Sequence, residues 1–507
     1  MLQYYLFFPI LCIPFLILIK WPSTVIKQKN LPPSPPKWPI LGNLHQLGLY
    51  PHRYLHSLAQ SYGPLITPAL IASSADVARE IMKNNDLVFS DRVKLSITDK
   101  LLYEGKDLST APYGEYWRQM RSICVLQLLS NKRVQAFRSV REEEVAILVR
   151  KIKESSVSAC PVNLSEVFAS LTNDVVCRVA LGRKYSDGEQ GRKFKELLGE
   201  FSILLGSYSI GDFIPWLSWV NSLTGFDARV EKVAKEFDEF LDGVVEEHVN
   251  DRKQRNNIPD QVDRDGHEKD LVDVLLQLQM DDMASFPLTN HSIKAIILDM
   301  FAAGTDTTYT VLEWAMSALI KHPRVMKELQ NEIRQTTLNK SKITEADLQK
   351  MPYLKAVMKE TLRLYPPIPL LVPRKSTQDV KIKGYDIAAG TVVFTNAWAI
   401  GRDPEVWDQP EEFRPERFLN TSVDFKGHDF QLIPFGAGRR GCPGISFAIA
   451  TNELLLANLV NLFDWTLPGG ASVDDLDMNE CSGFTSHRKA PLIAVATSGF
   501  LNGVRWQ

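Results

Sequence analysis

The chain has 507 residues, of which 45% are hydrophobic and 23% charged, and its formal net charge is −2 at pH 7. This is the composition of an ordinary globular protein, and the near-neutral balance excludes a nucleic-acid-binding protein. The six cysteines are scattered without Cys-x-x-Cys or zinc-ligand spacing, which excludes a disulfide scaffold and favours a reducing compartment.

The N-terminus predicts a membrane anchor at residues 1–20. Residues 1–19 carry no charge, are rich in Leu, Ile and Phe, and are about long enough to cross a bilayer. Lys20, Lys27 and Lys29 follow, which keeps the remainder of the chain on the cytoplasmic side. A cleaved signal peptide is the alternative, because Pro9 and Pro14 make the helix imperfect.

Residues 21–43 form a basic and proline-rich hinge. Prolines at 32, 33, 35, 36 and 39 restrict the backbone to extended geometry, so the hinge is a stiff arm between anchor and body. No later segment reads as a linker, and residues 44–507 are expected to form one body.

Helical periodicity dominates that body, and strand-like runs are few and short. The helical segments are 77–83, 116–129, 134–154, 166–181, 193–205, 227–249, 271–279 and 353–365. Short strands are expected at 380–383 and 391–396, and residues 250–270 read as a solvated surface loop. The fold class is therefore mainly α with small β-sheets.

Residues 289–322 form the longest apolar stretch of the body and predict a central buried helix of roughly 50 Å. Its middle contains the sequence Ala303-Gly304-Thr305-Asp306-Thr307-Thr308. Glycine and back-bonding threonine loosen a helix locally, and Asp306 with Thr307 supplies an acid and an alcohol for proton transfer. The other interpretation is a close helix–helix contact made by small residues.

Three charges predict a structural staple. Glu360 and Arg363 lie three residues apart on one helical face, and Arg417 provides a third charge. If Glu360 is buried, the two arginines tie down the segment before residue 434, although an ordinary surface pair is the alternative.

The most specific motif is Pro434-Phe435-Gly436-Ala437-Gly438-Arg439-Arg440-Gly441-Cys442-Pro443-Gly444. A cysteine at the start of a helix lies among free N–H donors, which favour the thiolate that binds iron. Gly438, Gly441 and Gly444 allow a close approach to a flat macrocycle, and Phe435 shields the sulfur. A buried structural cysteine is the alternative.

Indole and guanidinium donors elsewhere match an acidic ligand edge. Trp117 and Arg121 lie one helical turn apart, and together with Arg374 and Arg440 they are candidates to clamp two propionates. Further cations are candidates for a patch that receives an acidic electron donor, or they are ordinary solvated charges. These are Arg118, Lys132, Arg133 and Arg439.

Taken in order, these motifs resemble those of a cytochrome P450, and Phe89-Ser90-Asp91-Arg92 adds a likeness to the plant A-type group. The resemblance implies the P450 fold with an N-terminal transmembrane helix, haem b, and Cys442 as the ligand of its iron. It also implies a single-pass anchor in the endoplasmic reticulum with the catalytic domain in the cytosol. Electrons would come from NADPH–cytochrome P450 reductase, with cytochrome b5 as a second donor.

By the same resemblance, the protein is a monooxygenase that inserts one oxygen atom from O2 into a lipophilic plant metabolite. Coumarins, terpenoids and indolic compounds are the substrate classes, and hydroxylation, desaturation and C–C cleavage all remain open. Asp306 and Thr307 would be the catalytic pair. The implied substrate contacts are Ala302, Ala303, Ile368, Val372 and Phe484.

Two alternatives remain: a haem-thiolate isomerase or dehydratase that needs no external electrons, and an inactive haem-binding paralogue. The second is favoured by residues 66–72, where the family has two strands and a turn. Seven residues that include Pro68 predict a truncated hairpin.

Overall fold

The computed structural model describes residues 30–38, 42–43, 46–67, 69–185, 188–256, 269–280, 288–338, 340 and 342–499. The anchor predicted at residues 1–20 lies outside the described residues, as does part of the hinge.

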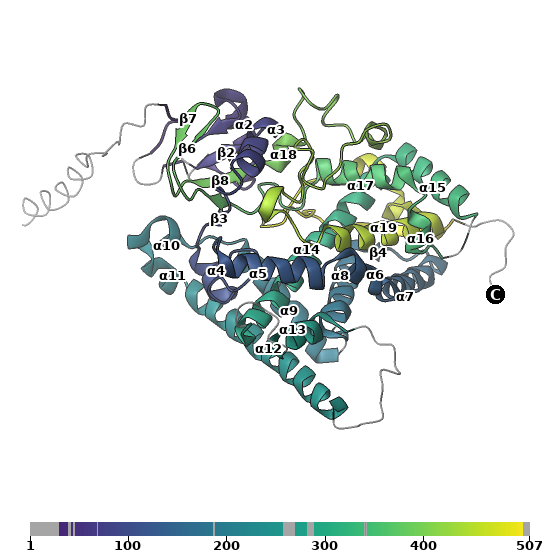
Figure 1. Ribbon diagram of the computed structural model, residues 1–507. Coiled ribbons are helices and arrows are strands. Elements are labelled where there is room, and N and C mark those ends of the chain that lie inside the picture. The colour runs from purple at the N-terminus through teal and green to yellow at the C-terminus, as the bar shows by residue number, and fades with distance from the viewer. Residues whose placement is uncertain are drawn as a thin grey trace, which may run out of the picture.

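Helices make up most of the molecule, and the strands form small sheets among them (Figure 1). The α-helices of the N-terminal half are α2 (Pro51–Tyr62), α3 (Ala75–Arg79), α4 (Ser96–Leu101), α5 (Glu115–Ile123), α6 (Asn131–Ala136), α7 (Arg138–Val157), α8 (Leu164–Leu181), α9 (Gly188–Leu205), α10 (Ile210–Phe213), α11 (Trp219–Leu223) and α12 (Phe226–Asn256). Those that follow are α13 (Leu271–Met280), α14 (Asn290–Lys321), α15 (Pro323–Thr337), α16 (Glu345–Leu348), α17 (Pro352–Leu364), α18 (Ala397–Ile400) and α19 (Ile445–Leu462).

The strands form three small sheets, which confirms the predicted fold class. Their bounds are β1 (Leu65–Ile66), β2 (Leu70–Ala72), β3 (Asp91–Arg92), β4 (Val162–Asn163), β5 (Arg374–Lys375), β6 (Val380–Ile382), β7 (Tyr385–Ile387), β8 (Val392–Thr395), β9 (Phe463–Thr466) and β10 (Ile493–Ser498). The orders are β1-β2-β8-β5-β3, β4-β10-β9 and β6-β7.

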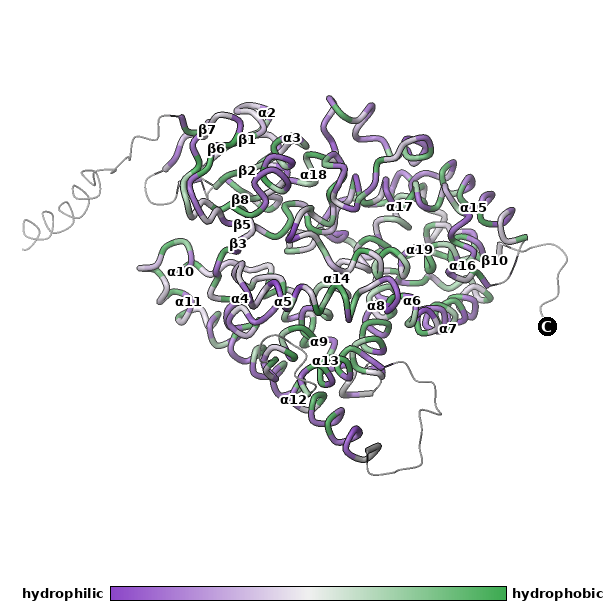
Figure 2. The backbone as a smooth tube through the Cα atoms, in the orientation of Figure 1, coloured by the Kyte–Doolittle hydropathy of each residue, from purple (hydrophilic) through white to green (hydrophobic). Residues whose placement is uncertain are grey.

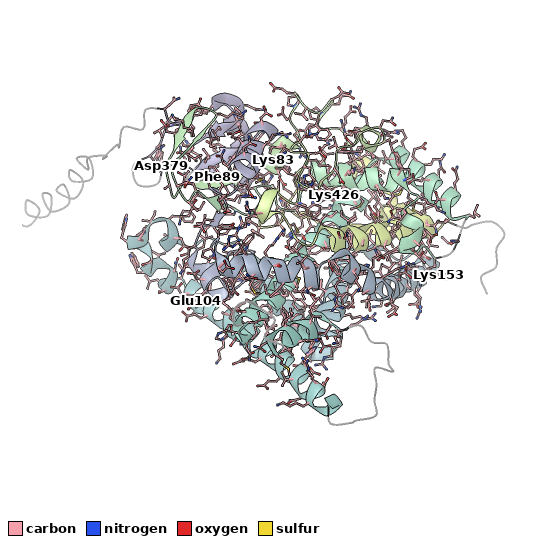
Figure 3. The ribbon with its side chains drawn as sticks, viewed as in Figure 1. Lys83, Phe89, Glu104, Lys153, Asp379 and Lys426 are labelled. Atoms are coloured by element: carbon pink, nitrogen blue, oxygen red, sulfur yellow. The ribbon has the colours of Figure 1, made fainter. Side chains whose placement is uncertain are left out.

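The truncated hairpin predicted at 66–72 is present, and it still completes a sheet. β1 and β2 pair over only two residues each, yet β2 pairs in parallel with three residues of β8. Phe89 is fully buried beside this sheet and shares its core cluster with Leu70 (Figure 3). The shortened segment therefore leaves the five-stranded sheet intact.

α14 runs through the centre of the molecule and organises the main core (Figure 1). Its 32 residues are unbroken, and the Thr289 hydroxyl caps its start by accepting the N–H of Ser292. Figure 2 shows apolar residues gathered in this interior, whereas α7 and α12 carry polar residues on their outer faces. The central helix predicted at 289–322 is thus confirmed.

The remaining helix predictions hold with small differences. Single π-helical turns extend two helices, at Glu80–Asn84 (η2) and Cys124–Leu128 (η3). The segment expected at 134–154 is split at Phe137, which ends α6 and begins α7. α12 continues to Asn256, into the range where a loop was expected at 250–270, and residues 257–268 of that range lie outside the described residues.

Within the described residues, α19 is long and apolar enough to cross a membrane, and 61% of it is buried inside the fold. It is a core helix that begins directly after the cysteine motif, so its apolar character is explained by packing.

Candidate active site

The cysteine motif forms a closed loop in front of α19. The Cys442 N–H donates to the carbonyl of Phe435 over 2.9 Å, and the Gly444 N–H donates to the Cys442 sulfur over 3.3 Å. Phe435 packs edge-to-face on Phe425, with 5.6 Å between the ring centroids. The sulfur therefore has one backbone donor, and an aromatic pair lies beside the loop.

Two glycines of the loop are required by backbone geometry. Gly436 and Gly438 have φ values of 69° and 68°, in the left-handed region that disfavours other residues. A Cβ on Gly438 would come within 2.4 Å of the carbonyl oxygen of Met82. Gly441 and Gly444 have negative φ, so the backbone freedom expected of them is not used here.

Burial raises the pKa of the Cys442 thiol, and it outweighs the Gly444 N–H and the Arg121 guanidinium, which lower it. The Gly444 N–H does favour the thiolate, as expected of a donor at a helix start, but burial opposes it more strongly. A metal ion at the sulfur removes the thiol proton outright, so the thiolate would come with the bound iron.

Three buried arginines lie together beside the loop. Arg440 donates to the carbonyls of Ser90, Leu108 and Ala111, and its guanidinium lies 4.1 Å from the ring centre of Trp117. Burial, followed by the nearby Arg374, lowers the pKa of Arg440 to about 10.

The indole N–H of Trp117 donates to Leu108, and Arg374 donates to Asp86 and to the carbonyl of Ala437. Several of the donors expected to face propionates are thus already bonded to the protein. Arg92, which was not among the predicted site residues, belongs to the same group, because Arg440 and Arg374 both lower its pKa.

Arg121 is different, since no described residue accepts a hydrogen bond from its guanidinium. Its pKa is lowered by burial and raised by Cys442, which places it between the ligand loop and the protein interior. A half-buried guanidinium beside mutually repelling arginines fits a ligand that carries two carboxylates and binds at Cys442. The donor set therefore fits a haem with its propionates toward the arginines.

The middle of α14 combines a packed side and an open side. A Cβ on Gly304 would lie 3.2 Å from Val176 of α8, so this glycine allows close helix packing. Ala303 is exposed although it lies on the central helix, and the Thr307 hydroxyl donates to its carbonyl over 2.6 Å. The packed side confirms the close helix–helix contact, the helix is continuous through the motif, and proton transfer by Asp306 and Thr307 stays a prediction.

The Asp306 carboxylate is bound by the hydroxyl of Thr485, a residue of the 480–488 loop. Three further contacts fasten this loop: Trp314 donates to the carbonyl of Ser486, Ser486 donates to Glu480, and Arg488 donates to Ser317. The contact of Thr485 with Asp306 could not be read from the sequence, because 179 residues separate the two.

The predicted substrate contacts come from three segments. Ala302 and Ala303 lie on α14, Ile368 and Val372 are half-buried after α17, and Phe484 is exposed on the 480–488 loop. A Cβ on Gly206, at the end of α9, would lie 2.8 Å from the backbone nitrogen of Phe484. α9 and this loop therefore meet closely, and a side chain at residue 206 would push them apart.

The structure brings the predicted staple together. Glu360 is fully buried and accepts two hydrogen bonds from Arg363, at 2.7 and 2.8 Å, and one from Arg417 at 3.1 Å. Arg363 also donates to the carbonyls of Gly401, Pro410 and Glu412. The bond from Arg417 and the three bonds to carbonyls join α17 to the 401–418 segment, which precedes the cysteine loop.

The expected electron-donor patch is partly neutralised within the chain. Arg118 pairs with Glu115, Arg439 pairs with Asp86 over 3.2 Å, and Arg133 donates to the carbonyl of Lys269.

Comparison with known proteins identifies the family. The family model described as "Cytochrome P450" matches residues 32–495. "Cytochrome P450 736A117" of Prunus mume is 58% identical over an alignment of 506 residues, which covers 97% of this chain and 96% of that protein. "(+)-menthofuran synthase" of Mentha piperita is 50% identical over 94% of each chain, and "Norfluorocurarine oxidase" of a Strychnos species is 53% identical over 92% of each.

Solved structures agree on the fold. A zebrafish cytochrome P450 determined with progesterone has a TM-score of 0.73 and 25% identity, over 88% of this chain and 99% of that one. The cysteine loop, the arginines, the central helix and these matches lead to one conclusion: the chain belongs to the cytochrome P450 family, close to its plant members, and is a haem-thiolate monooxygenase.

Proposed function

We propose that the protein inserts one oxygen atom from O2 into a lipophilic plant specialised metabolite. Electrons would come from NADPH through a membrane-bound flavin reductase. The observations that carry the proposal are the Cys442 loop with its backbone donor to sulfur, and a central helix on which the apolar Ala303 is exposed.

When bound, the haem supplies the activation of O2, and the residues of the chain supply position and protons. The Thr307 hydroxyl lies on the open side of α14 and donates to Ala303, so it has a lone pair left for an incoming proton. The Asp306 carboxylate, held by Thr485, would pass a proton from water to that hydroxyl. Cys442 holds the haem iron, and Arg121 is the residue best placed to hold a propionate.

A lipophilic substrate is supported by the chemistry of the side chains that are predicted to contact it. The candidates Ala302, Ala303, Ile368, Val372 and Phe484 are all apolar. Relatives support the class as well, because two of them carry names for the formation of menthofuran and the oxidation of norfluorocurarine. Coumarins, terpenoids and indolic compounds are therefore the first compounds to test.

Membrane attachment is supported by a group of exposed apolar side chains, here called the apolar ridge. Its members are Tyr208, Ile210, Phe213, Trp216, Trp219 and Leu223, all at least 41% exposed. Asn30 bonds to the β6–β7 turn, so the chain enters the body on the side where α10 and α11 also lie (Figure 1). A ridge of this kind suits an interface with lipid.

The decisive experiment is turnover in a reconstituted system. Purified protein, flavin reductase, NADPH and O2 are incubated with candidate metabolites, and binders are first selected by their change in haem spin state. The proposal requires a product that gains one oxygen atom and depends on NADPH. Turnover without NADPH and O2 would instead establish an isomerase or dehydratase. If the sequons at Asn163, Asn290, Asn339 and Asn420 carried sugar, the cytosolic location would be wrong.

A further inference from the structure

Two buried carboxylates bind one short turn of the backbone outside the residues assigned above. Asp107 is fully buried, and Asp299 of α14 is 8% exposed. Asp299 accepts the Leu108 N–H over 2.6 Å. Asp107 accepts the Thr110 N–H over 2.7 Å and the Ser109 hydroxyl over 2.6 Å. The N–H side of residues 107–111 is therefore held by carboxylates.

The carbonyl side of the same turn is held by the cationic cluster. Leu108 accepts from Trp117 over 3.0 Å and from Arg440 over 3.3 Å, and Ala111 accepts from Arg440 over 2.6 Å. Arg92 donates to the carbonyl of Ser109 over 2.9 Å. The turn thus connects α14 to side chains that lie at the edge of the haem site.

Only one of the two carboxylates faces cations. Burial lowers the pKa of Arg92 and of Arg440, and the carboxylate of Asp107, which lies near both guanidinium groups, offsets part of that lowering. Asp299 instead faces Asp107, Tyr116 of α5 and Cys124 of η3, all neutral or negative. Burial, followed by the charge of Asp107, raises the pKa of Asp299 well above its ordinary value. Two adjacent buried carboxylates do not both ionise, and Asp107 already accepts three hydrogen bonds, from the Ser109 hydroxyl and from the N–H and hydroxyl of Thr110.

We propose that Asp299 is a positioning residue that acts as a neutral carboxylic acid, clamping residues 107–111 to α14 so that their carbonyls hold Arg440, Trp117 and Arg92. Asp299 lies four residues before Ala303 and eight before Thr307, on the same face of α14. The contact between Asp299 and Leu108 therefore lies next to the open side of α14. It is a structural contact and does not serve to bind a positively charged substrate. The link to the haem edge rests on the proposed function, whereas the clamp itself does not.

Asparagine tests the charge state, because it has the shape of aspartic acid and is always neutral. We expect Asp299→Asn to keep the unfolding temperature of the purified haem-bound protein at pH 5. Because the pKa of Asp299 is raised in the native state, the unfolded wild-type chain releases this proton at a lower pH than the native state does. As pH rises from 5 to 8, the unfolding temperature of Asp299→Asn should therefore rise relative to the wild type.

Asp107→Asn is the matched control, because it makes the same chemical change at the neighbouring carboxylate. It removes the charge that faces Arg92 and Arg440, so we expect a lower unfolding temperature at both pH values. Asp299→Leu removes the hydrogen-bond acceptor, and amide exchange at Leu108 should become about tenfold faster than in Asp299→Asn.

Three results would overturn the proposal. The first is an Asp299→Asn protein that fails to fold or is less stable than Asp107→Asn. The second is a difference in unfolding temperature between Asp299→Asn and the wild type that stays constant or falls as pH rises. The third is equal amide exchange at Leu108 in the Asn and Leu variants. Unfolding and exchange are measured without substrate or reductase, so failure of the proposed reaction would leave this test unaffected.

Discussion

At the scale of single residues, Gly438 shows how the backbone brings the cysteine loop against its neighbours. Its φ is 68°, and Gly469 has a nearly equal φ of 66°. The difference lies in the surroundings. A Cβ on Gly438 would meet Met82 and Asp86 within 2.5 Å, whereas a Cβ on Gly469 would have nothing within 4 Å.

We therefore predict that Gly438→Ala prevents accumulation of the haem-bound protein. Gly469→Ala, which carries only the cost of a left-handed residue, should lose about 1–2 kcal/mol of stability. Absorbance of bound haem after purification and thermal unfolding measure both effects. Equal behaviour of the two variants would show that the close approach at Gly438 does not matter.

Glu360 is the second residue with a sharp expectation, because it is fully buried and bonded to two arginines. Glu360→Ala leaves Arg363 buried without its partner, and we predict a loss of about 3–5 kcal/mol. The control is Glu196→Ala, which breaks the exposed pair between Arg192 and Glu196 and should cost below about 1 kcal/mol. Denaturant unfolding measures the stability lost in each variant. Similar losses for Glu360→Ala and Glu196→Ala would contradict the structural role of Glu360.

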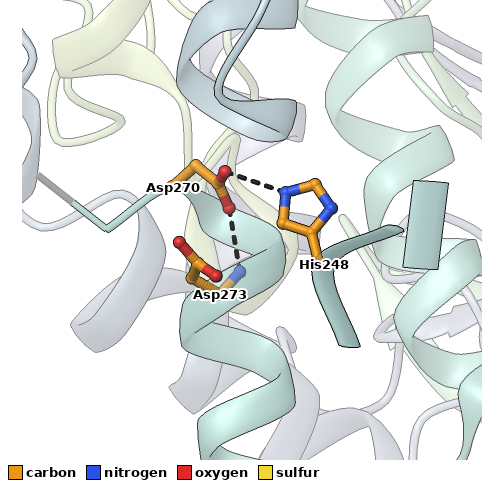
Figure 4. A group of neighbouring side chains, drawn as sticks. All are labelled: His248, Asp270 and Asp273. Carbon is orange, nitrogen blue, oxygen red and sulfur yellow. Dashed lines mark hydrogen bonds and ion pairs between the residues drawn. The ribbon is translucent and has the colours of Figure 1, made fainter. Parts of the chain in front are cut away.

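At the scale of elements, His248 fastens the end of α12 to the start of α13 (Figure 4). Its Nε2 lies 2.9 Å from Asp270, and its Nδ1 donates to the carbonyl of Val244. Asp270 in turn accepts the N–H of Asp273 and caps α13. These groups satisfy one another, which explains why His248, Asp270 and Asp273 lie together without invoking a metal.

This contact predicts a pH dependence. Burial lowers the pKa of His248, but Asp270 and Val244 outweigh it and raise the pKa from 6.5 to about 9. The native state therefore holds the proton more tightly than the unfolded state. The stabilisation, on the order of 3 kcal/mol, is complete below pH 6.5 and is lost as pH rises through 9.

Thermal unfolding between pH 6 and 9 tests this pH dependence. The variant His248→Gln is compared with His428→Gln, a change at an exposed histidine. We expect the difference between His248→Gln and the wild type to shrink as pH rises. His428→Gln should show no such trend, and a constant difference for His248→Gln would contradict the contact.

The sequence predicted helices well and contacts between distant segments poorly. α8, α14 and α17 have strong apolar periodicity with clear ends, such as the capping Thr289 and the prolines after Tyr365. Two hydrogen bonds depend on where loops fold back, which periodicity does not encode. They run from Trp117 to Leu108 and from Thr485 to Asp306. The same holds for Asp299, visible in the sequence only as a charge within an apolar helix.

At the scale of the whole molecule, the apolar ridge predicts how the body meets the membrane. Trp216 and Trp219 are 65% and 57% exposed, whereas Trp407 is 7% exposed. In vesicles that contain brominated lipid, we expect the Trp216→Phe/Trp219→Phe double variant to lose much of the fluorescence quenching seen in the wild type. Trp407→Phe should keep it, and equal quenching in all three proteins would place the ridge in water.

The central claim is that the sulfur of Cys442 binds haem iron, because the arginines, the α14 motif and the substrate contacts take their roles from that bond. The most direct measurement is the absorption spectrum of the reduced protein under carbon monoxide, for the wild type and for Cys442→His. We predict the red-shifted band of thiolate ligation in the wild type and its absence in the variant. A wild-type protein that binds haem without this band, or a variant that retains it, would contradict the account.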